Sequence, residues 1–129
     1  MTRKSKGTNA EREIVRMFWQ NGWACFRSAG SGSMRFPGPD IIAGNKVRKI
    51  AIECKTTKGT SIYLDDHDVS QIKEFSDSFG AEPWVGVRFD KVGWFFLNLE
   101  DIEKTGKGYK LDLFGAKRKG LSFEELIQQ

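Results

Sequence analysis

The stretch FPGPDIIAG, residues 36–44, is followed after a short gap by KIAIECK, residues 49–55. Both are rich in Ile and flanked by Gly, Pro or Asn, which is typical of two strands joined by a turn. The first strand begins on a carboxylate, Asp40, and the second carries Glu53 and Lys55 in its interior. Charged side chains are costly in a strand that packs against a core, so a salt bridge, open solvent or a metal ion must compensate them.

The spacing of these charges determines what they can do. Alternate residues of a strand share a face, so Glu53 and Lys55 point to the same side, about 7 Å apart. A hairpin that turns through Asn45–Arg48 places Asp40 opposite Glu53, with their Cβ atoms about 5 Å apart. Two carboxylates at that separation repel, and the pKa of one rises unless a cation lies between them. A divalent ion that prefers oxygen ligands, such as Mg²⁺, fits this arrangement.

A simpler interpretation of the same residues stays open. Glu53 and Lys55 can form an exposed ion pair on one face of an edge strand, worth at most about 1 kcal/mol. An isolated Glu-x-Lys tripeptide usually has that role. Three features together favour the metal site: the Gly- and Pro-rich turn into Asp40, the register that opposes it to Glu53, and the basic chain. Lys55 would then stabilise negative charge on a phosphate.

Length and composition indicate a soluble protein of one domain. The chain has 129 residues, 39% of them apolar and 29% charged, which is enough for a core and ordinary for a globular fold. No apolar run approaches the roughly 20 residues that span a bilayer, and the basic MTRKSKG start lacks the apolar stretch of a signal peptide. We expect a cytoplasmic, nucleoid-associated protein without a membrane partner, in which Cys25 and Cys54 are buried free thiols.

Charge is distributed unevenly along the chain. The segment from Asp65 to Glu82 carries −5, so the rest of a chain with a net charge of +4 carries +9. This asymmetry suits a polyanionic partner, with the acidic segment turned away from it. A solvated basic surface explains the charge equally well, so charge alone does not choose between the two.

The order of the expected elements predicts an α/β fold with a mixed central β-sheet flanked by helices. One helix runs from Thr8, its N-cap, to about Asn21, and Gly22 ends it; a second runs from Asp65 or Asp66 to Gly80. The tail from Glu100 is weakly patterned apart from a last turn that Ser122 caps. We therefore expect one domain over 1–129, with a core at about 8–100 and a C-terminal extension at 101–129. The expected strands lie at 23–27, 40–43, 49–55, 61–64, 84–89 and 93–99.

The charged residues of the first hairpin also match a known signature. Pro39–Asp40 followed by Glu53–Cys54–Lys55 is the PD-(D/E)xK pattern of the restriction-endonuclease-like nucleases. With AERE at 10–13 and FRSAGS at 26–31, the chain resembles the archaeal Holliday junction resolvases over about residues 4–100. The resemblance implies a structure-selective endonuclease that resolves four-way DNA junctions, in recombination and repair, by paired symmetrical metal-dependent nicks leaving a 5′-phosphate.

The resemblance assigns a role to each residue of the site. Asp40 and Glu53 match the metal ligands of the family, and Lys55 matches its catalytic lysine. Glu11 matches a helix carboxylate that completes the metal site, and Ser31 matches a loop serine near the scissile phosphate. The implied cofactor is Mg²⁺, with Mn²⁺ as a substitute. The side chains expected to contact DNA are Arg3, Lys4, Lys6, Arg27, Ser31, Ser33, Arg35 and Lys58.

Two positions complicate this assignment. Glu11 also forms a capping-box pattern with Thr8, in which its carboxylate would reach the Thr8 backbone N–H. The cap and the metal compete for one side chain. Before the second helix, close relatives carry basic residues where this chain has Asp65, Asp66 and His67, which argues against DNA contacts there. His67 is interpreted as a solvent-facing residue at the helix start.

A four-way junction has two-fold symmetry, and two opposed strands must be nicked to resolve it. One site per chain therefore implies a homodimer. A sliding clamp or another recombination factor is considered separately as a further partner. The aromatic residues of two adjacent strands offer surface for such an interface, although each taken singly is better explained as core. They are Trp84, Phe89, Trp94, Phe95 and Phe96, with Leu97 beside them.

Two other functions stay open. A sequence-specific restriction or repair enzyme with the same signature would need elements that read bases, and none is evident in so short a chain. A non-catalytic DNA-binding protein would use the same carboxylates only as ion pairs. Replacing Asp40 distinguishes the latter from a nuclease, because only the nuclease would lose activity.

Overall fold

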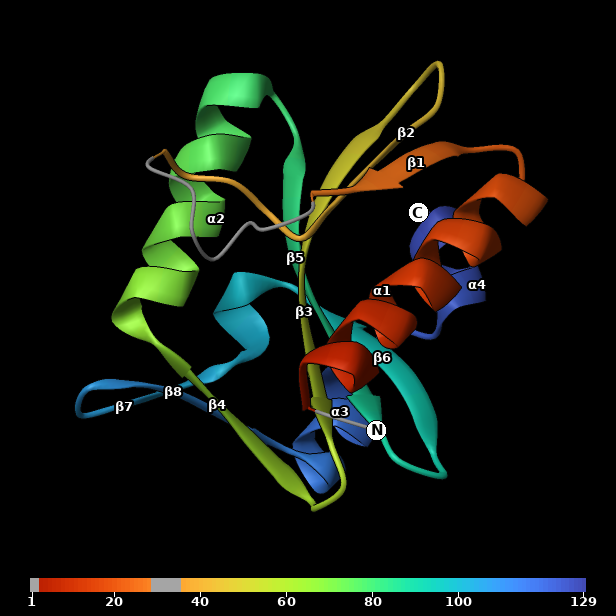
Figure 1. The fold of residues 1–129 in the computed structure, drawn as a ribbon. Helices are drawn as coiled ribbons and strands as arrows, with labels where there is room; N and C mark the ends of the chain where they lie inside the picture. Colours follow the sequence, from red (N-terminus) through yellow and green to blue (C-terminus); the bar gives the residue numbers. More distant parts are fainter. Residues whose placement is uncertain (1–2, 29–35) are drawn as a thin grey trace.

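Eight strands form two sheets in the part of the chain that the structure describes (Figure 1). The structure is a computed structural model that describes residues 3–28 and 36–129, with residues 3–6 as backbone alone. The strands are β1 (Ala24–Arg27), β2 (Ile41–Gly44), β3 (Lys49–Thr57), β4 (Ser61–Asp65), β5 (Glu82–Phe89), β6 (Gly93–Leu97), β7 (Glu103–Thr105) and β8 (Gly108–Asp112).

The larger sheet has the order β1-β2-β3-β5-β6 and the smaller one the order β4-β8-β7. In the larger sheet, β3 and β5 are parallel, while the other neighbours are antiparallel. The sheet is therefore mixed, as the order of elements predicted. The helices are α1 (Arg3–Gln20), α2 (Asp66–Phe79), α3 (Leu113–Lys119) and α4 (Phe123–Ile127).

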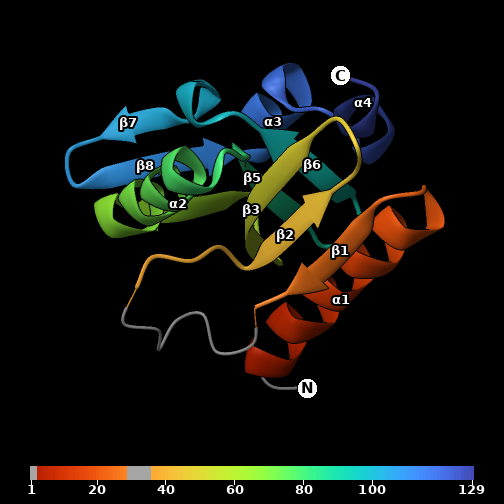
Figure 2. The same cartoon turned by 90° about the horizontal axis from the view of Figure 1, so that it is seen from above.

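The larger sheet separates two hydrophobic clusters. The first holds Ile14 and Phe18 of α1 against Ile52 and Phe96. The second holds Val69 of α2 with Val85, Val87 and residues of the smaller sheet. Figure 1 shows α1 and α2 on opposite sides of β3, and Figure 2 shows α1 beside β1 at the end of the molecule away from β7 and β8. Helices thus flank both faces, as predicted.

The hairpin that carries the charged residues forms as predicted. Its turn is closed by a 2.9 Å hydrogen bond from the Asn45 N–H to the Arg48 carbonyl. The Asn45 side chain also accepts hydrogen bonds from the Val47 and Arg48 N–H groups, at 2.8 and 2.7 Å. Ile41 therefore pairs with Ile52, which fixes the register on which the site depends.

The second helix and its caps are also confirmed. The Asp65 carboxylate accepts a hydrogen bond from the Asp68 N–H at 2.7 Å, and the Asp68 carboxylate accepts one from the Asp65 N–H at 3.2 Å. This capping box begins α2, and Gly80, with φ of 80°, ends it. His67 is exposed at the helix start, as expected.

The start of the first helix was predicted wrongly. α1 begins at Arg3, so Thr8 lies inside the helix and does not cap it. The basic residues before Thr8 are good helix formers, and the single Gly7 lowers the helix propensity without ending the helix. The predicted end is correct, because α1 stops at Gln20 and Gly22 has a φ of 82°.

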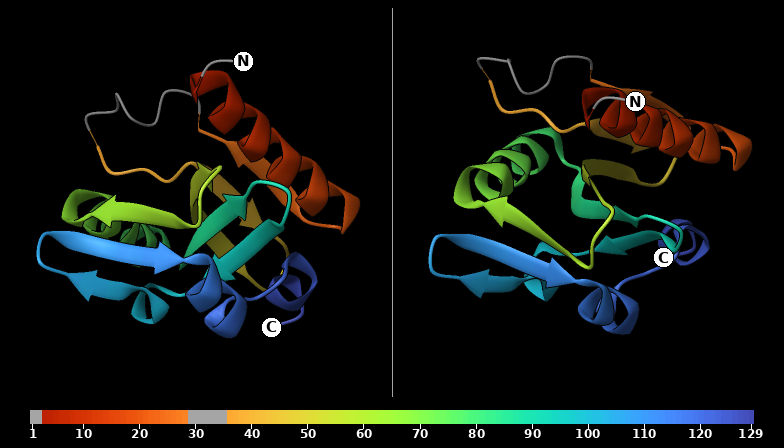
Figure 3. Two further views of the ribbon diagram at one scale, coloured as in Figure 1. Left: turned by 90° about the horizontal axis from the view of Figure 1, so that it is seen from below. Right: turned by 60° about the horizontal axis from the view of Figure 1, so that its bottom comes forward.

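The tail is more ordered than its weak sequence pattern indicated. Beyond Leu99 it forms β7, β8, α3 and α4, of which only the Ser122-capped final turn was expected. Leu111 and Ala116 enter the second cluster, and Phe123 and Leu126 enter the first. Figure 3 shows β7 and β8 beside β4, with α3 at the end of β8 and α4 further along, near the C-terminus. Helices of seven and five residues are too short for a helical period to appear in the sequence.

Both cysteines are free thiols, as predicted, Cys25 being buried and Cys54 half-buried. Burial raises the pKa of the Cys25 thiol to about 12, so it carries no thiolate near neutral pH. None of the described helices is long and apolar enough to cross a membrane.

Candidate active site

The charged residues of the first hairpin gather where β2 leaves β3. The ladder between the two strands ends at the pair Ile41–Ile52. One residue earlier, the Asp40 N–H donates to the Ile52 carbonyl at 3.1 Å, and the Asp40 carbonyl accepts from the Ser28 N–H at 2.8 Å. The Asp40 carboxylate accepts from the Cys54 N–H at 2.9 Å. Asp40 is therefore held between Ser28, which follows β1, and β3. We call the point where β2 and β3 separate, at Asp40 and Glu53, the fork.

Glu53 is the residue of β3 that the register places opposite Asp40. Burial and, next, the Asp40 charge raise the pKa of the Glu53 carboxyl to about 8, against the opposing effect of the Lys55 charge. This is the electrostatic state expected for two opposed carboxylates without a cation between them. Glu53 is thus an acid that a bound cation would deprotonate near neutral pH.

Glu11 reaches the same region from α1. Burial and the Asp40 charge raise the pKa of its carboxyl. The Arg27 Nε–H, at the end of β1, donates to Glu11 Oε1 at 3.3 Å, and this ion pair opposes the rise. Glu11 therefore belongs to the acidic group around Asp40, and the capping box predicted with Thr8 does not form.

The three carboxylates suit a hard divalent cation. They offer oxygen ligands, Asp40 raises the pKa of both Glu11 and Glu53, and Glu11 raises that of Glu53. Within residues 3–28 and 36–129, however, no three Asp, Glu, His or Cys side chains lie close enough to hold a metal as they stand. A side-chain rearrangement, such as a shift of Glu11 away from Arg27, would be needed to bring the three carboxylates together, and it would leave the Arg27 guanidinium available to a phosphate.

Lys55 lies one step further along the same face of β3 and contacts α2. Its Nζ is 3.5 Å from Asp68 Oδ2. One helical turn later, the Gln71 amide donates to the Gly38 carbonyl at 2.8 Å, just before Asp40. The acidic segment was predicted to turn away from a polyanionic partner, and the structure places one of its residues, Asp68, beside Lys55 of the candidate site. Asp68 also belongs to the capping box of α2, and nothing in the local sequence pattern distinguishes an acid that only caps a helix from one that also contacts Lys55.

The remaining predicted residues are placed only in part. Ser31, Ser33 and Arg35 lie outside the described residues. Lys58 is exposed between β3 and β4. The backbone of Arg3, Lys4 and Lys6 is helical, and their side chains are not described.

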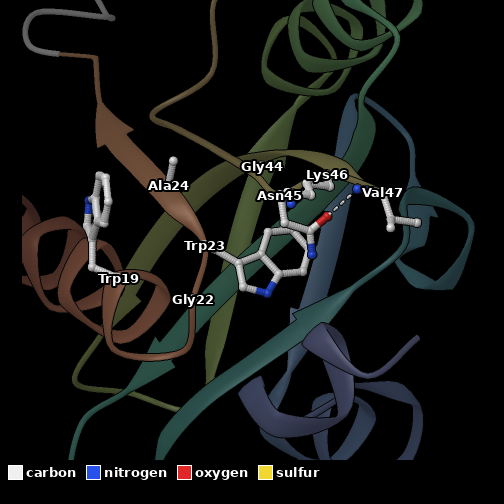
Figure 4. Close-up of a pocket in the computed structure, with 8 residues that line it drawn as sticks. All are labelled: Trp19, Gly22, Trp23, Ala24, Gly44, Asn45, Lys46 and Val47. Carbon is white, nitrogen blue, oxygen red and sulfur yellow. Dashed lines mark hydrogen bonds between the residues drawn. The ribbon is translucent and has the colours of Figure 1, made fainter.

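A shallow apolar groove lies away from the carboxylates, between the start of β1 and the turn of the β2–β3 hairpin (Figure 4). Trp19, Trp23 and Val47 form much of its lining, and Lys46 is its only charged residue. None of the described residues that line the groove is acidic, so the groove is distinct from the candidate site.

A mixed sheet flanked by helices, with Asp40, Glu53 and Lys55 at a fork between two strands, is the restriction-endonuclease-like α/β fold. The solved structure of Archaeoglobus fulgidus Hjc, a Holliday junction resolvase, matches this chain with a TM-score of 0.87 and 36% sequence identity. The match covers 93% of this chain and 97% of that one.

Comparisons of sequence agree. A crossover junction endodeoxyribonuclease Hjc of Archaeoglobus fulgidus is 41% identical over 109 residues, covering 84% of this chain and 80% of that protein. A protein of the same name from Sulfolobus acidocaldarius is 35% identical over 131 residues, covering 99% of this chain and 90% of that protein. The model of the family "Archaeal holliday junction resolvase (hjc)" matches residues 2–129. The chain belongs to this family, and the match includes the tail.

Proposed function

We propose that this chain is a structure-selective endonuclease that resolves four-way DNA junctions by paired, symmetrical, metal-dependent nicks. The observation that carries the proposal is the pair of carboxylates, Asp40 and Glu53, held at the fork beside Lys55. The relatives are named crossover junction endodeoxyribonucleases, and they support the same substrate.

Asp40, Glu53 and Glu11 would hold Mg²⁺, for which Mn²⁺ would substitute. When bound, such an ion lowers the pKa of a water molecule and neutralises charge on the phosphate. Asp40 is already fixed by hydrogen bonds from both sides, whereas Glu11 must exchange its partner Arg27. The Asp40 carboxylate would therefore form the permanent part of the site.

The cationic residues would act on the phosphodiester. The Lys55 ammonium, on the same face of β3 as Glu53, would stabilise negative charge on the non-bridging oxygens. Arg27, once released by Glu11, would contact a phosphate. Cleavage of the bond to the 3′-oxygen would leave a 5′-phosphate and a 3′-hydroxyl.

Two nicks on opposed strands require two sites, so the working unit would be a two-fold homodimer. Of the aromatic residues first considered for its interface, Trp84, Phe89 and Phe96 are buried within the chain, whereas Trp94 and Phe95 are partly exposed. The symmetry of the substrate therefore carries this part of the proposal. A sliding clamp or another recombination factor stays a prediction.

The test is cleavage of a labelled four-way junction in Mg²⁺, with a linear duplex as control. Asp40→Asn and Glu53→Gln should each lower the single-turnover rate at least about 100-fold while junction binding is retained. The Asn side chain can still accept from the Cys54 N–H, so the fork should persist. Asp77→Asn and Glu74→Gln, exposed acids on α2, make the same changes elsewhere and should cleave normally.

The products test the remaining details. A nicked duplex that DNA ligase reseals without prior phosphorylation carries a 5′-phosphate and a 3′-hydroxyl. Mixed dimers of wild type and Asp40→Asn should nick only one strand. Junction binding without cleavage in Mg²⁺ or Mn²⁺ would leave a DNA-binding protein, and cleavage confined to one duplex sequence would indicate a restriction-type enzyme.

A further inference from the structure

The contact between α2 and Lys55 is not explained by the stability of either element. Lys55 Nζ lies 3.5 Å from Asp68 Oδ2, and the two side chains are 32% and 25% exposed. A half-exposed ion pair of this length contributes little to folding, at most about 1 kcal/mol. The position of the contact beside the fork suggests that it serves the site.

Asp68 is held in place independently of Lys55. The oxygen that faces the ammonium also accepts from the Asp65 N–H at 3.2 Å, and the Asp65 carboxylate binds the Asp68 N–H at 2.7 Å. The reciprocal bonds of the capping box restrict the Asp68 rotamer. The Asp68 carboxylate is therefore held in one position and can bind the flexible Lys55 side chain there.

Lys55 has a competing partner on its own strand. Glu53 lies on the same face of β3, about 7 Å away along the strand, and Asp40 lies opposite Glu53. A lysine ammonium on a four-carbon stem can reach such carboxylates. Without an opposing anion, Lys55 would occupy the space between the two carboxylates that a metal ion requires.

We propose that Asp68 is a positioning residue, which holds the Lys55 ammonium on the α2 side of the site and leaves Asp40 and Glu53 open to a metal ion. The inference rests on the proposed nuclease function. The Gln71–Gly38 hydrogen bond supports it, because the same face of α2 also binds the segment that leads into Asp40. α2 thus contacts both halves of the fork.

The decisive variant is Asp68→Asn, which removes the charge and keeps an oxygen to accept from the Asp65 N–H. We expect the single-turnover rate of junction cleavage to fall about 10- to 100-fold, with junction affinity unchanged. Asp66→Asn is the matched control, because Asp66 lies in the same turn but pairs with Lys104. Asp68→Glu should recover most of the rate, since Glu is the residue preferred at this capping-box position.

A second measurement does not depend on cleavage. In the metal-free protein, the side-chain ¹⁵N relaxation of the Lys55 ammonium, assigned by its loss in Lys55→Met, should show restricted motion. The exposed Lys46 provides the mobile reference. Asp68→Asn should make Lys55 as mobile as Lys46, while Asp66→Asn should leave it restricted.

Equal cleavage rates for wild type, Asp66→Asn and Asp68→Asn would overturn the inference and leave the proposed function intact. A Lys55 ammonium as mobile as that of Lys46 in the wild type would also overturn it, whatever the variants do. A wild type that cleaves no junction would instead refute the nuclease function, and the relaxation measurement would still decide whether Asp68 holds Lys55.

Discussion

Asp40 is bound at its N–H, its carbonyl and its carboxylate, each to a different backbone group. The Glu11 carboxylate, in contrast, is held by an ion pair with Arg27, the one such contact it makes within the described part of the chain. A metal ion binds most tightly where its ligands are already fixed, because less conformational entropy is lost. In the proposed metal site, Asp40 would thus be the preorganised ligand, and Glu11 would be the one that moves.

The raised pKa of Glu53 predicts how the metal-free protein responds to pH. The folded chain keeps a proton on Glu53 up to about pH 8, whereas an unfolded glutamate releases it near 4.5. The folded state therefore binds more protons between these values, and the free energy of unfolding falls as the pH rises from about 5 to about 8. Thermal denaturation in a chelator across this range should show a falling Tm.

Glu53→Gln removes the ionisable group and should flatten that dependence, raising the Tm at pH 8 by roughly 5 °C. Glu74→Gln, which changes an exposed glutamate, should keep the wild-type slope. Mg²⁺ should raise the Tm of the wild type most at pH 8, where the carboxylate is free to bind it. The same slope for wild type and Glu53→Gln would show that Glu53 ionises normally.

At the scale of elements, the fork depends on the smaller sheet that supports α2. Gly108 of β8 packs so closely on β4 that a Cβ there would collide with the Leu64 carbonyl oxygen and lie 3.2 Å from the Asp65 Cα. Because Asp65 is the N-cap of α2, a change at Gly108 is transmitted to the helix start. The atoms that a Cβ would meet belong to the β4 backbone, so β4 and β8 would have to move apart.

Gly108→Ala should therefore lower the free energy of unfolding by about 1–3 kcal/mol and slow cleavage as well. Gly106→Ala, in the neighbouring turn, is the control, since a Cβ at Gly106 meets nothing within 4 Å. Urea denaturation of the two variants measures the difference. Equal stability would mean that β4 and β8 can separate without cost.

Local chemistry explains which elements could be predicted from the sequence. The β2–β3 hairpin has Ile-rich strands around a turn that Asn45 closes by itself, and α2 has both its cap and its terminal Gly80. The start of α1 has no such marker. The strands and helices beyond Leu99 are short and gain their order from contacts with distant residues, which a local pattern does not contain.

The same reasoning applies to the site. The opposition of Asp40 to Glu53 follows from one turn, so it could be derived from the sequence. The ion pairs Arg27–Glu11 and Lys55–Asp68 join elements whose approach depends on the whole fold. Neither could be predicted from spacing, and the second places a residue of the acidic segment beside the candidate site.

At the scale of the whole molecule, the tail completes the core. Phe123→Ala should lower the free energy of unfolding by about 3–5 kcal/mol, because Phe123 is 5% exposed and packs on Phe18 and Phe96. Phe114→Ala is the same substitution at a side chain that is 72% exposed, and should change stability by about 0.5 kcal/mol or less. Denaturant titrations compare the two. Similar losses would show that the tail is not part of the core.

The first cluster also joins Ile14, near the start of this sequence, to Leu126, near its end. On the ribosome, α1 and the larger sheet emerge long before the residues that cover them. The apolar face that later receives α4 is then exposed to water and to other nascent chains until synthesis has passed Leu126. The first cluster can therefore be completed only after α4 has been translated, and a chaperone that shields that face during synthesis would raise the yield of folded protein.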